Sequence, residues 1–394
     1  MVVQTIQSVG LRMSYNKIFK FNIMEIIEKG QCGERVSYEL YEDGTLKIFG
    51  VGEMYNYKYP TEDSPFTELC RKIKKVVVSL GVTTIGNSAF YYCDSLVSVE
   101  LSNSITKIGD SAFCLCSSLL DIDIPNSVTE IKSSAFSNCK SLKVVNLGNS
   151  IVTLDSCTFI HCVSLVSVNI PNSVIEIRDK VFSFCESLRF VDIPDSVTKI
   201  GLEAFHQCYR LDTIKIGQNV VDIEHNAFDI CNGLTNIIVD ERNKKYSSEK
   251  GVLYNKSKSV LLKYPAQKSE PIFVVPDSVE VIGQKAFFKC KLLKRIKMTQ
   301  KVREIEDNAL GCCEGLRIVD IDGELEKIGT GAFDYCYNII SLSIASELSP
   351  ILEDKLPSIV ETVEIRVPKN SIHYYRAARG WNRFTNYVAI EDEN

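Results

Sequence analysis

Apolar residues recur along this chain at a fixed step of 23 residues. Each unit opens on an aliphatic side chain, and the openers of the first run are Val82, Ile105, Val128, Ile151, Val174, Val197 and Val220. After an interruption the same step resumes at Val279, Val302, Leu325 and Leu348. A fixed period of about 20–50 residues is the signature of stacked repeats, each too small to bury its own apolar face. The pattern therefore predicts a solenoid.

One unit reads V-x-x-I-x-x-x-A-F-x-x-C-x-x-L-x-x-V-x-I-P-x-S, and its clearest copy begins at Val128. The alternating apolar residues of L-x-x-V-x-I predict a half-buried strand. The Pro or Gly that follows, with Asn or Asp and then Ser, is typical of a turn. The segment A-F-x-x-C-x-x-L has apolar residues three apart, which favours a short helical or 3-10 turn. We therefore expect an α/β repeat solenoid with a strand and a short helical turn in each coil.

Three columns of like side chains should lie inside the stacked coils. Phenylalanine recurs at 90, 113, 136, 159, 182, 205, 228, 287 and 333, and Leu310 replaces it once. Cysteine recurs at 93, 116, 139, 162, 185, 208, 231, 290, 313 and 336. Leucine recurs at 96, 119, 142, 165, 188, 211, 234, 293 and 316, and Ile339 replaces it once. Because neighbouring strands lie about 4.8 Å apart, each column should place like against like.

The unit resembles the BspA-like leucine-rich repeats, also called the Treponema pallidum type. Gly30-Gln31-Cys32-Gly33 followed by Tyr41-Glu42-Asp43-Gly44-Thr45-Leu46 is similar to the β-rich N-terminal cap of that family. Val367-Pro368, Tyr374, Ala377, Gly380-Trp381 and Phe384 are similar to its C-terminal closing unit. The resemblance implies a right-handed leucine-rich-repeat superhelix. It also implies a non-enzymatic protein-binding role, adhesin-like or in contact with a host, at the cell surface or after secretion.

These features divide the chain into six segments. They are a leader of unknown role (1–29), a β-rich N-terminal cap (30–80), seven repeat units (81–239), a β-hairpin insertion (240–275), three repeat units (276–347) and a C-terminal capping unit (348–394). In the insertion, residues 251–254 and 260–264 favour two strands joined by a turn at 255–259. The hairpin is interpreted as a side flap that splits the solenoid, or as a projecting contact element.

Composition narrows the classes of function. A net charge of −5 argues against a nucleic-acid partner, because phosphate recognition needs a basic surface. No apolar run reaches roughly 18 residues, so we expect no membrane insertion. The most apolar stretch of the leader, Phe19 to Ile27, is interrupted by polar residues and shows no cleavage site, so no signal peptide is recognisable. A cytoplasmic location therefore stays open beside the surface location that the resemblance implies.

The cysteine column allows three interpretations. Zinc sites need clustered, convergent thiolates, and ten sulfurs on stacked coils should instead point one way. Disulfides between coils are disfavoured because parallel Cβ directions do not suit the required dihedral angle. Cysteine as a small buried apolar group fits best. Outside the column, Cys32 and Cys70 near the cap are candidates for one disulfide.

No catalytic pattern stands out in the sequence. The histidines at 161, 206, 225 and 373 do not recur at one repeat position, and no phosphate loop or metal-protease motif is present. We therefore expect no enzyme activity, no catalytic or metal-binding residues and no cofactor. An enzyme would need a site built by the caps or by the insertion.

The outward residues of the predicted strands form the candidate ligand face. They are Glu100, Asp121, Asp123, Val144, Asn146, Asn169, Phe190, Asp192, Thr213, Lys215, Arg295 and Lys297. The face should have an acidic end, a basic section near the insertion and apolar anchors such as Phe190. Equal strand registers should place Asp192 beside Lys215 and Phe190 beside Thr213. A surface of merely mixed, tolerated residues is the alternative.

The leading hypothesis is a protein-binding module whose partner is a host extracellular-matrix protein or another cell-surface protein. A structural spacer without a selective ligand is the second hypothesis, and an enzyme is the third. A spacer would be insensitive to substitutions on the strand face, whereas a binding module would not.

Overall fold

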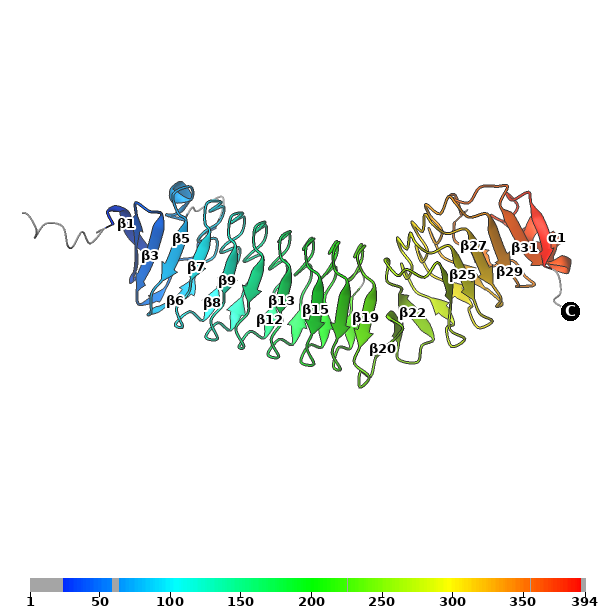
Figure 1. Ribbon diagram of the computed structural model, residues 1–394, viewed down its shortest axis with the longest axis horizontal. Helices are drawn as coiled ribbons and strands as arrows, with labels where there is room; N and C mark the ends of the chain where they lie inside the picture. Colours follow the sequence, from blue (N-terminus) through cyan, green and yellow to red (C-terminus); the bar gives the residue numbers. More distant parts are fainter. Residues whose placement is uncertain (1–23, 59–63, 225, 355, 391–394) are drawn as a thin grey trace, which may run out of the picture.

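The protein is an elongated parallel β-solenoid of stacked coils (Figure 1). The computed structural model describes residues 24–58, 64–224, 226–354 and 356–390. A β-rich cap forms one end, and the short helix α1 (Ile372–Ala377) lies at the other. Residues 1–23 of the expected leader lie outside the described residues, and strand β1 (Ile26–Gly33) begins before the expected start of the cap at residue 30.

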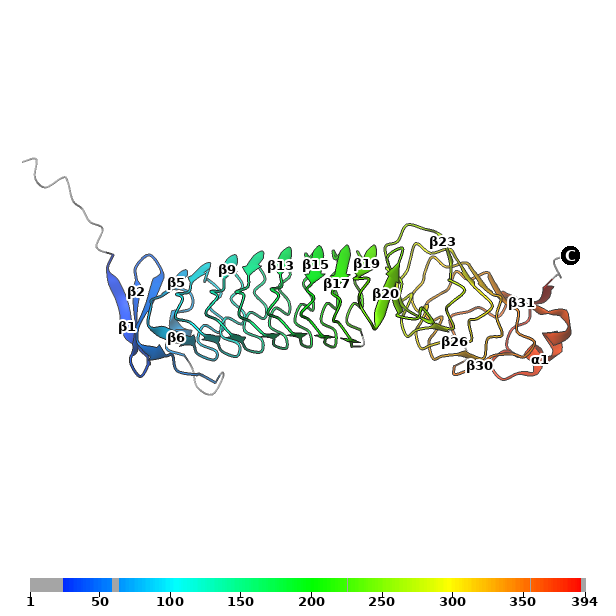
Figure 2. The same cartoon turned by 90° about the horizontal axis from the view of Figure 1, so that it is seen from below.

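Two rows of strands line opposite sides of the solenoid (Figure 2). The front row begins at the cap and comprises β1, β2 (Val36–Tyr41), β3 (Thr45–Gly50), β5 (Lys75–Val78), β7 (Ser98–Glu100), β9 (Asp121–Asp123), β11 (Val144–Asn146), β13 (Ser167–Asn169), β15 (Phe190–Ile193), β17 (Thr213–Ile216) and β19 (Asn236–Val239). The back row comprises β4 (Gly52–Glu53), β6 (Val82–Ile85), β8 (Lys107–Ile108), β10 (Glu130–Ile131), β12 (Thr153–Leu154), β14 (Glu176–Ile177), β16 (Lys199–Ile200) and β18 (Asp222–Ile223). We call the coils up to β19 the first array.

The second array repeats this arrangement toward the C-terminus. Its front row is β23 (Ile272–Val274), β25 (Arg295–Met298), β27 (Ile318–Ile321), β29 (Ser341–Ile344), β31 (Glu364–Pro368) and β32 (Tyr387–Ile390). Its back row is β20 (Tyr246–Glu249), β21 (Val252–Asn255), β22 (Val260–Lys263), β24 (Val281–Ile282), β26 (Glu304–Ile305), β28 (Lys327–Ile328) and β30 (Ile351–Leu352). The 3-10 helix η2 (Thr67–Leu69) lies between β4 and β5, and η3 (Lys369–Ser371) precedes α1.

The expected helical turn of each repeat is wrong. In the third coil, Ser134 and Asn138 adopt left-handed backbone angles, with φ of 58° and 60°, so no helix forms there. Their amide groups point out of the coil and donate to the carbonyls of Ser156 and Ile160, at 3.0 and 2.8 Å. A 3-10 helix would direct every amide to its own turn. This segment therefore joins coil to coil as a third ladder of main-chain bonds, which we call the turn face.

Phenylalanine rings stack through the interior as the sequence predicts. Phe136 is fully buried, and its ring centroid lies 5.4 Å from that of Phe113 and 5.5 Å from that of Phe159. The planes of these stacked rings are nearly parallel, at 5° and 7°. Offset stacking of this kind adds about 0.5–1.5 kcal/mol per pair beyond the burial of area. The column is therefore a main source of cohesion between coils.

The cysteine column is buried beside the rings. Cys139 donates its thiol proton to the carbonyl of Phe113 at 3.2 Å, and Cys162 does the same to Phe136 at 3.2 Å. All fifteen cysteines are free thiols. Burial raises the pKa of Cys139 and Cys185 well above the ordinary thiol value. The column thus consists of neutral, small, buried groups.

The repeat begins earlier than the sequence suggested. Phe66 stacks on Phe90 with ring centroids 5.0 Å apart, and Cys70 continues the cysteine column below Cys93. This coil could not be recognised from the spacing, because Cys70 is four positions after Phe66, whereas a regular unit has its cysteine three positions after the phenylalanine. At the other end, Leu348 is 68% exposed and is not a repeat opener. One extra residue in this last coil shifts the strand pairing between β28 and β30 by one position.

The insertion is not a free flap. Its strands β21 and β22 form the predicted antiparallel hairpin, but β22 also pairs in parallel with β24 of the second array. Tyr264 takes the place of the column phenylalanine, with its ring centroid 5.1 Å from that of Phe287. Tyr254 and Tyr264 are each only 1% exposed, so neither ring is available for contact with a partner. Much of the insertion is thus a degenerate repeat coil.

A buried ion cluster fastens the two arrays together. The carboxylate of Asp229, on the last regular coil of the first array, lies 3.0 Å from Lys263 Nζ and 2.9 Å from Lys285 Nζ. Burial alone would raise the pKa of Asp229, but the two lysines outweigh it and hold the pKa below its ordinary value. The side chain of Lys285 also donates to Asn226 Oδ1 at 2.8 Å. The ion cluster therefore connects one array to the other.

Candidate functional site

The outward residues of the front row form a regular surface, which we call the strand face. In the front-row repeat strands β7 to β19, the central valine or isoleucine is buried, and the residues on either side of it are exposed or half-buried. Strand β11 pairs with β9 and β13 in register, so Val144 lies between Asp121 and Ser167, and Asn146 lies beside Asp123. Of the twelve candidate residues, eleven are exposed and Thr213 is half-buried. Their predicted outward orientation is confirmed.

The pairs predicted on β15 and β17 are also present. Phe190 pairs with Thr213 and Asp192 with Lys215 in the strand register. Lys215 Nζ lies 3.6 Å from Asp192 Oδ2 and 5.3 Å from the centroid of the Phe190 ring. The ring itself is 42% exposed. An apolar ring, a cation and a carboxylate therefore meet on two neighbouring coils.

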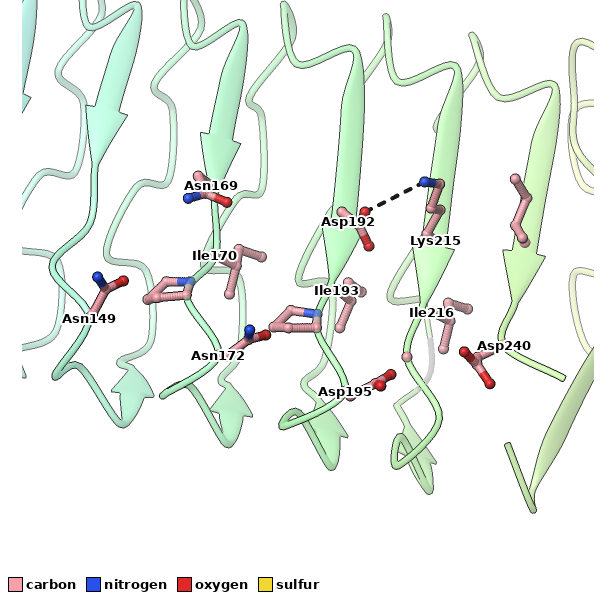
Figure 3. Close-up of a pocket in the computed structure, with 14 residues that line it drawn as sticks. Asn149, Asn169, Ile170, Asn172, Asp192, Ile193, Asp195, Lys215, Ile216 and Asp240 are labelled. Atoms are coloured by element: carbon pink, nitrogen blue, oxygen red, sulfur yellow. Dashed lines mark ion pairs between the residues drawn. The ribbon is translucent and has the colours of Figure 1, made fainter. Parts of the chain in front are cut away.

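A groove of about 500 Å³ opens beside this cluster, at the carboxyl ends of β13, β15 and β17 (Figure 3). Asn169, Asp192 and Lys215 project from the strands, and the turns that follow the strands supply the residues below them. These turn residues are Asn149, Asn172, Asp195 and Asp240. These turn residues were not assigned to the ligand face from the sequence, because Asn or Asp after the Pro or Gly of a repeat is typical of a turn. A signal was present, since Asn149, Asn172 and Asp195 recur at the step of 23 residues and therefore stack in one column.

Charges in the groove are partly compensated. Arg242 Nη2 lies 2.8 Å from Asp240 Oδ2 and 3.3 Å from Asp195 Oδ2. Hydrogen bonds from Arg242 lower the pKa of Asp240 to about 2, so this carboxylate is charged at neutral pH. With Asp192 and Lys215, the groove presents carboxylates, amides and a cation beside an exposed ring. Such a mixture suits a polar ligand with an apolar anchor group.

The structure does not bring all candidate residues together. Arg295 and Lys297 lie on β25 in the second array, paired to β23 at Ile272 and Val274. These two apolar residues are 56% and 55% exposed, and the sequence interpretation missed them because their coil lies in the insertion. Arg295 forms an ion pair with Asp320 at 2.6 Å, and Lys297 with Asp322 at 3.1 Å. The expected basic section is therefore separated from Lys215.

The back row has a smaller pocket of about 240 Å³ at the junction of the arrays, and many of its exposed charges neutralise one another along the coils. Lys199 Nζ lies 3.2 Å from Asp222 and 2.8 Å from Glu224. Lys327 is likewise paired with Glu304 and Glu353, at 3.3 and 2.8 Å. Exposed pairs of this kind contribute little to stability and leave little net charge for a partner. The front row is therefore the better candidate surface.

Within the described ranges, no helix has both the length and the apolar character needed to cross a membrane. In the same part of the chain, no group of three His, Cys, Asp or Glu side chains is arranged to hold a metal ion. Two of the described histidines contact one ring: His161 stacks on Phe184, and His206 meets the same ring edge-on, with centroids 4.2 and 5.7 Å away. His373 lies against Tyr374 in the C-terminal helix.

The regular coils and the buried Phe and Cys columns match a known repeat profile. The profile described as "BspA type Leucine rich repeat region (6 copies)" matches residues 62–189, 153–269 and 266–377. The chain belongs to the BspA-type leucine-rich repeat family. The match indicates no catalytic family, and solenoids of this kind commonly bind along an extended surface.

Two solved structures with TM-scores above 0.5 share the fold. A leucine rich cell surface protein of Faecalibacterium prausnitzii is 24% identical, with a TM-score of 0.56 over 91% of this chain and 94% of that chain. The pneumococcal vaccine antigen PcpA is 17% identical, with a TM-score of 0.51 over 93% of this chain and 100% of that chain. The T. pallidum leucine-rich repeat protein is 29% identical over 51% of this chain and 88% of that chain, with a TM-score of 0.40. None of the curated proteins matches the chain.

Proposed function

We propose that this BspA-type protein is a non-enzymatic binding module that captures a partner protein on the strand face of the first array. The observation that carries the proposal is the position of the groove. It adjoins Phe190, which is 42% exposed, and it is lined by Asp192 and Lys215. An exposed aromatic anchor beside a polar groove is the arrangement that gives interfaces most of their energy.

We further propose an adhesin-like role at the cell surface or after secretion. The partner class is a host extracellular-matrix protein or another cell-surface protein. The family match and the description of the F. prausnitzii protein as a cell surface protein support this location. A spacer without a selective ligand and an enzyme with a site in the caps or in the insertion are the rival functions, and the described structure offers no observation that favours either.

Binding to immobilised proteins tests the proposal. Solubilised extracellular-matrix proteins and solubilised cell-surface proteins are coated on separate sensor surfaces, and capture of the purified chain is measured. Phe190→Ala combined with Lys215→Glu should weaken capture by about tenfold or more, equivalent to ~1.4 kcal/mol. The charge reversal should act mainly on the association rate and should depend on salt.

A matched control carries the same kinds of change away from the strand face. Leu202→Ala with Lys140→Glu removes an exposed apolar side chain and reverses one lysine elsewhere on the first array. The control should bind like the unaltered protein, and both variants should keep the melting temperature. Equal loss in the control would place the site elsewhere, for example around exposed Ile272 and Val274. No selective capture by the unaltered protein would favour the spacer.

A further inference from the structure

The N-terminal end of the cysteine column differs from the rest. Cys70 Sγ lies 3.0 Å from Cys93 Sγ on the next coil. Farther along, the column thiols donate to main-chain carbonyls at short distances, as in the bond from Cys116 Sγ to Phe90 O at 3.2 Å, whereas Cys70 Sγ lies 3.8 Å from the carbonyl oxygen of Tyr91. Two sulfur atoms at this separation are closer than an ordinary van der Waals contact between thiols. The short distance between the two sulfur atoms thus distinguishes this pair from the regular cysteines of the column.

The local backbone explains the difference. A regular column cysteine follows a left-handed residue, such as Tyr92 (φ 63°) before Cys93. Cys70 instead ends the 3-10 helix η2, with φ of −47° and ψ of −41°. Regular coils hold their Cβ atoms parallel, which does not suit a disulfide, but Cys70 approaches Cys93 from a helical backbone. The parallel Cβ geometry that disfavours a disulfide between regular column cysteines therefore does not apply to Cys70 and Cys93.

Only one thiol of the pair borders a pocket. Cys70, which is 6% exposed, lines an open pocket of about 380 Å³ together with Thr67, Glu68, Arg71, Tyr92 and Asp94, whereas Cys93 is fully buried. The hydrogen bond with Cys93 lowers the pKa of the Cys70 thiol, and the same bond together with burial raises the pKa of Cys93. A reagent in solution therefore meets Cys70 first, and Cys70 is the thiol that ionises more readily.

We propose that Cys70 and Cys93 are a disulfide-forming pair that is oxidised by a small-molecule disulfide. The Cys70 thiolate attacks one sulfur of the small disulfide, forms a mixed disulfide and expels one thiolate. The sulfur of Cys93 then attacks the sulfur of Cys70, forms the Cys70–Cys93 bond and expels the second thiolate. Both protons lost by the protein are taken up by the two released thiolates. The protein pair is oxidised, and the small disulfide is reduced to two thiols.

The product would tie η2 to the first full coil. The cross-link spans 23 residues and joins two coils otherwise held by stacking of Phe66 on Phe90. Constraining the unfolded chain in this way favours the folded state. Oxidation should therefore raise the denaturant midpoint of the N-terminal end of the solenoid while the strand face stays unchanged.

Peptide mapping of the full-length protein tests the proposal. The reduced protein is incubated with oxidised glutathione, its remaining thiols are blocked, and it is digested with trypsin without reduction. Residues 59–71 and 76–107 are tryptic peptides that each contain one cysteine of the pair. We expect them to be joined, with a mass lower by two hydrogen atoms than their sum. Cys93→Ala should abolish the joined species and leave glutathione attached to Cys70.

Two further variants keep the test decisive. Cys70→Ala should prevent both the link and the glutathione adduct, so a misfolded Cys93 variant would not obscure the result. Cys162→Ala, a regular column position, should leave the link unchanged. Circular dichroism confirms that each variant is folded. A link from Cys70 to Cys32 in peptide 30–35, a link between two chains, or persistence of both free thiols in the native protein would overturn the proposal.

Discussion

A single substitution in the phenylalanine column is expected to lower the free energy of unfolding substantially. Phe136 is fully buried between two parallel rings, so Phe136→Ala should remove two stacking contacts and leave a cavity. We expect a loss of roughly 3–5 kcal/mol in the free energy of unfolding. Urea denaturation measures the loss, and exposed Lys140→Ala is the control. A shift well below about 1 kcal/mol at Phe136 would mean that the column does not hold the coils together.

The buried thiols make stability depend on pH above neutrality. Burial raises the pKa of column cysteines such as Cys139 and Cys185 above the ordinary value of 9.0. In the unfolded chain these thiols ionise near the ordinary value, so their stabilising contribution is full below it and is lost as the pH rises above it. The urea midpoint should therefore fall steeply between pH 8 and pH 10.

A single substitution isolates this effect. Cys139→Ala removes one titrating thiol and should flatten the slope above pH 9 by about 1.4 kcal/mol per pH unit. Unfolding curves at closely spaced pH values provide the slope. If the midpoint stays constant up to pH 10, or if the variant has the slope of the unaltered protein, the thiols are not buried in neutral form.

At the scale of elements, sequence periodicity predicted the front-row strands, the outward residues and the pairs on β15 and β17, but not the strands of the back row. It failed where a coil departs from the repeat spacing. The first coil was not recognised as a repeat because of the added residue between Phe66 and Cys70. Another coil was interpreted as an insertion because Tyr264 replaces the phenylalanine of the column. The helical turn was wrong because left-handed backbone at residues such as Ser134 leaves no composition signal. The groove could not be foreseen, since it depends on how turns follow strands in space.

The junction between the arrays depends on one carboxylate. Asp229→Asn would leave Lys263, whose side chain is 11% exposed, without a charged partner. Breaking a buried pair in this way costs about 3–5 kcal/mol. The pKa of Asp229 is lowered from 3.8, so the carboxylate stabilises the protein above that pH and its contribution disappears as the pH falls through the lowered value.

Denaturation of the Asp229→Asn variant measures this cost. The difference from the unaltered protein should be largest near neutral pH and should shrink below pH 3.8. Adding Lys263→Met removes the orphaned charge and should restore part of the stability. No loss at neutral pH, or no rescue by the second substitution, would contradict the role of the ion cluster.

The molecule as a whole has two apolar interiors that meet at β21. Leu253 belongs to the interior of the first array, whereas its neighbours Val252 and Tyr254 belong to that of the second. The turn-face ladder is interrupted at the same place. Among the described residues, the amides of Asn226, Phe228 and Ile230 have no main-chain acceptor on a following coil. The solenoid is therefore expected to open first at this junction.

Amide hydrogen exchange tests this expectation. The amide of Phe205 donates to Ala227 at 2.9 Å and is the matched position one coil earlier. We expect Phe228 to exchange at least about a hundredfold faster than Phe205 under native conditions, because local opening needs less free energy there. Equal protection at the two positions would mean that the arrays form one cooperative unit.

The direction of the turn-face bonds gives the stack unlike ends. The amide of Phe136 donates to Thr158 on the following coil, and the amide of Phe159 donates onward to Val181. At the C-terminal end the donors meet side chains instead: Gly331 donates to Asp354 Oδ2 at 2.5 Å, and Tyr335 to Ser358 Oγ at 2.8 Å. Two copies stripped of their caps would expose complementary donor and acceptor edges and could grow head to tail into a fibre. Asp354 and Ser358 thus satisfy two main-chain donors at the C-terminal end of the turn face that would otherwise be open to a second copy.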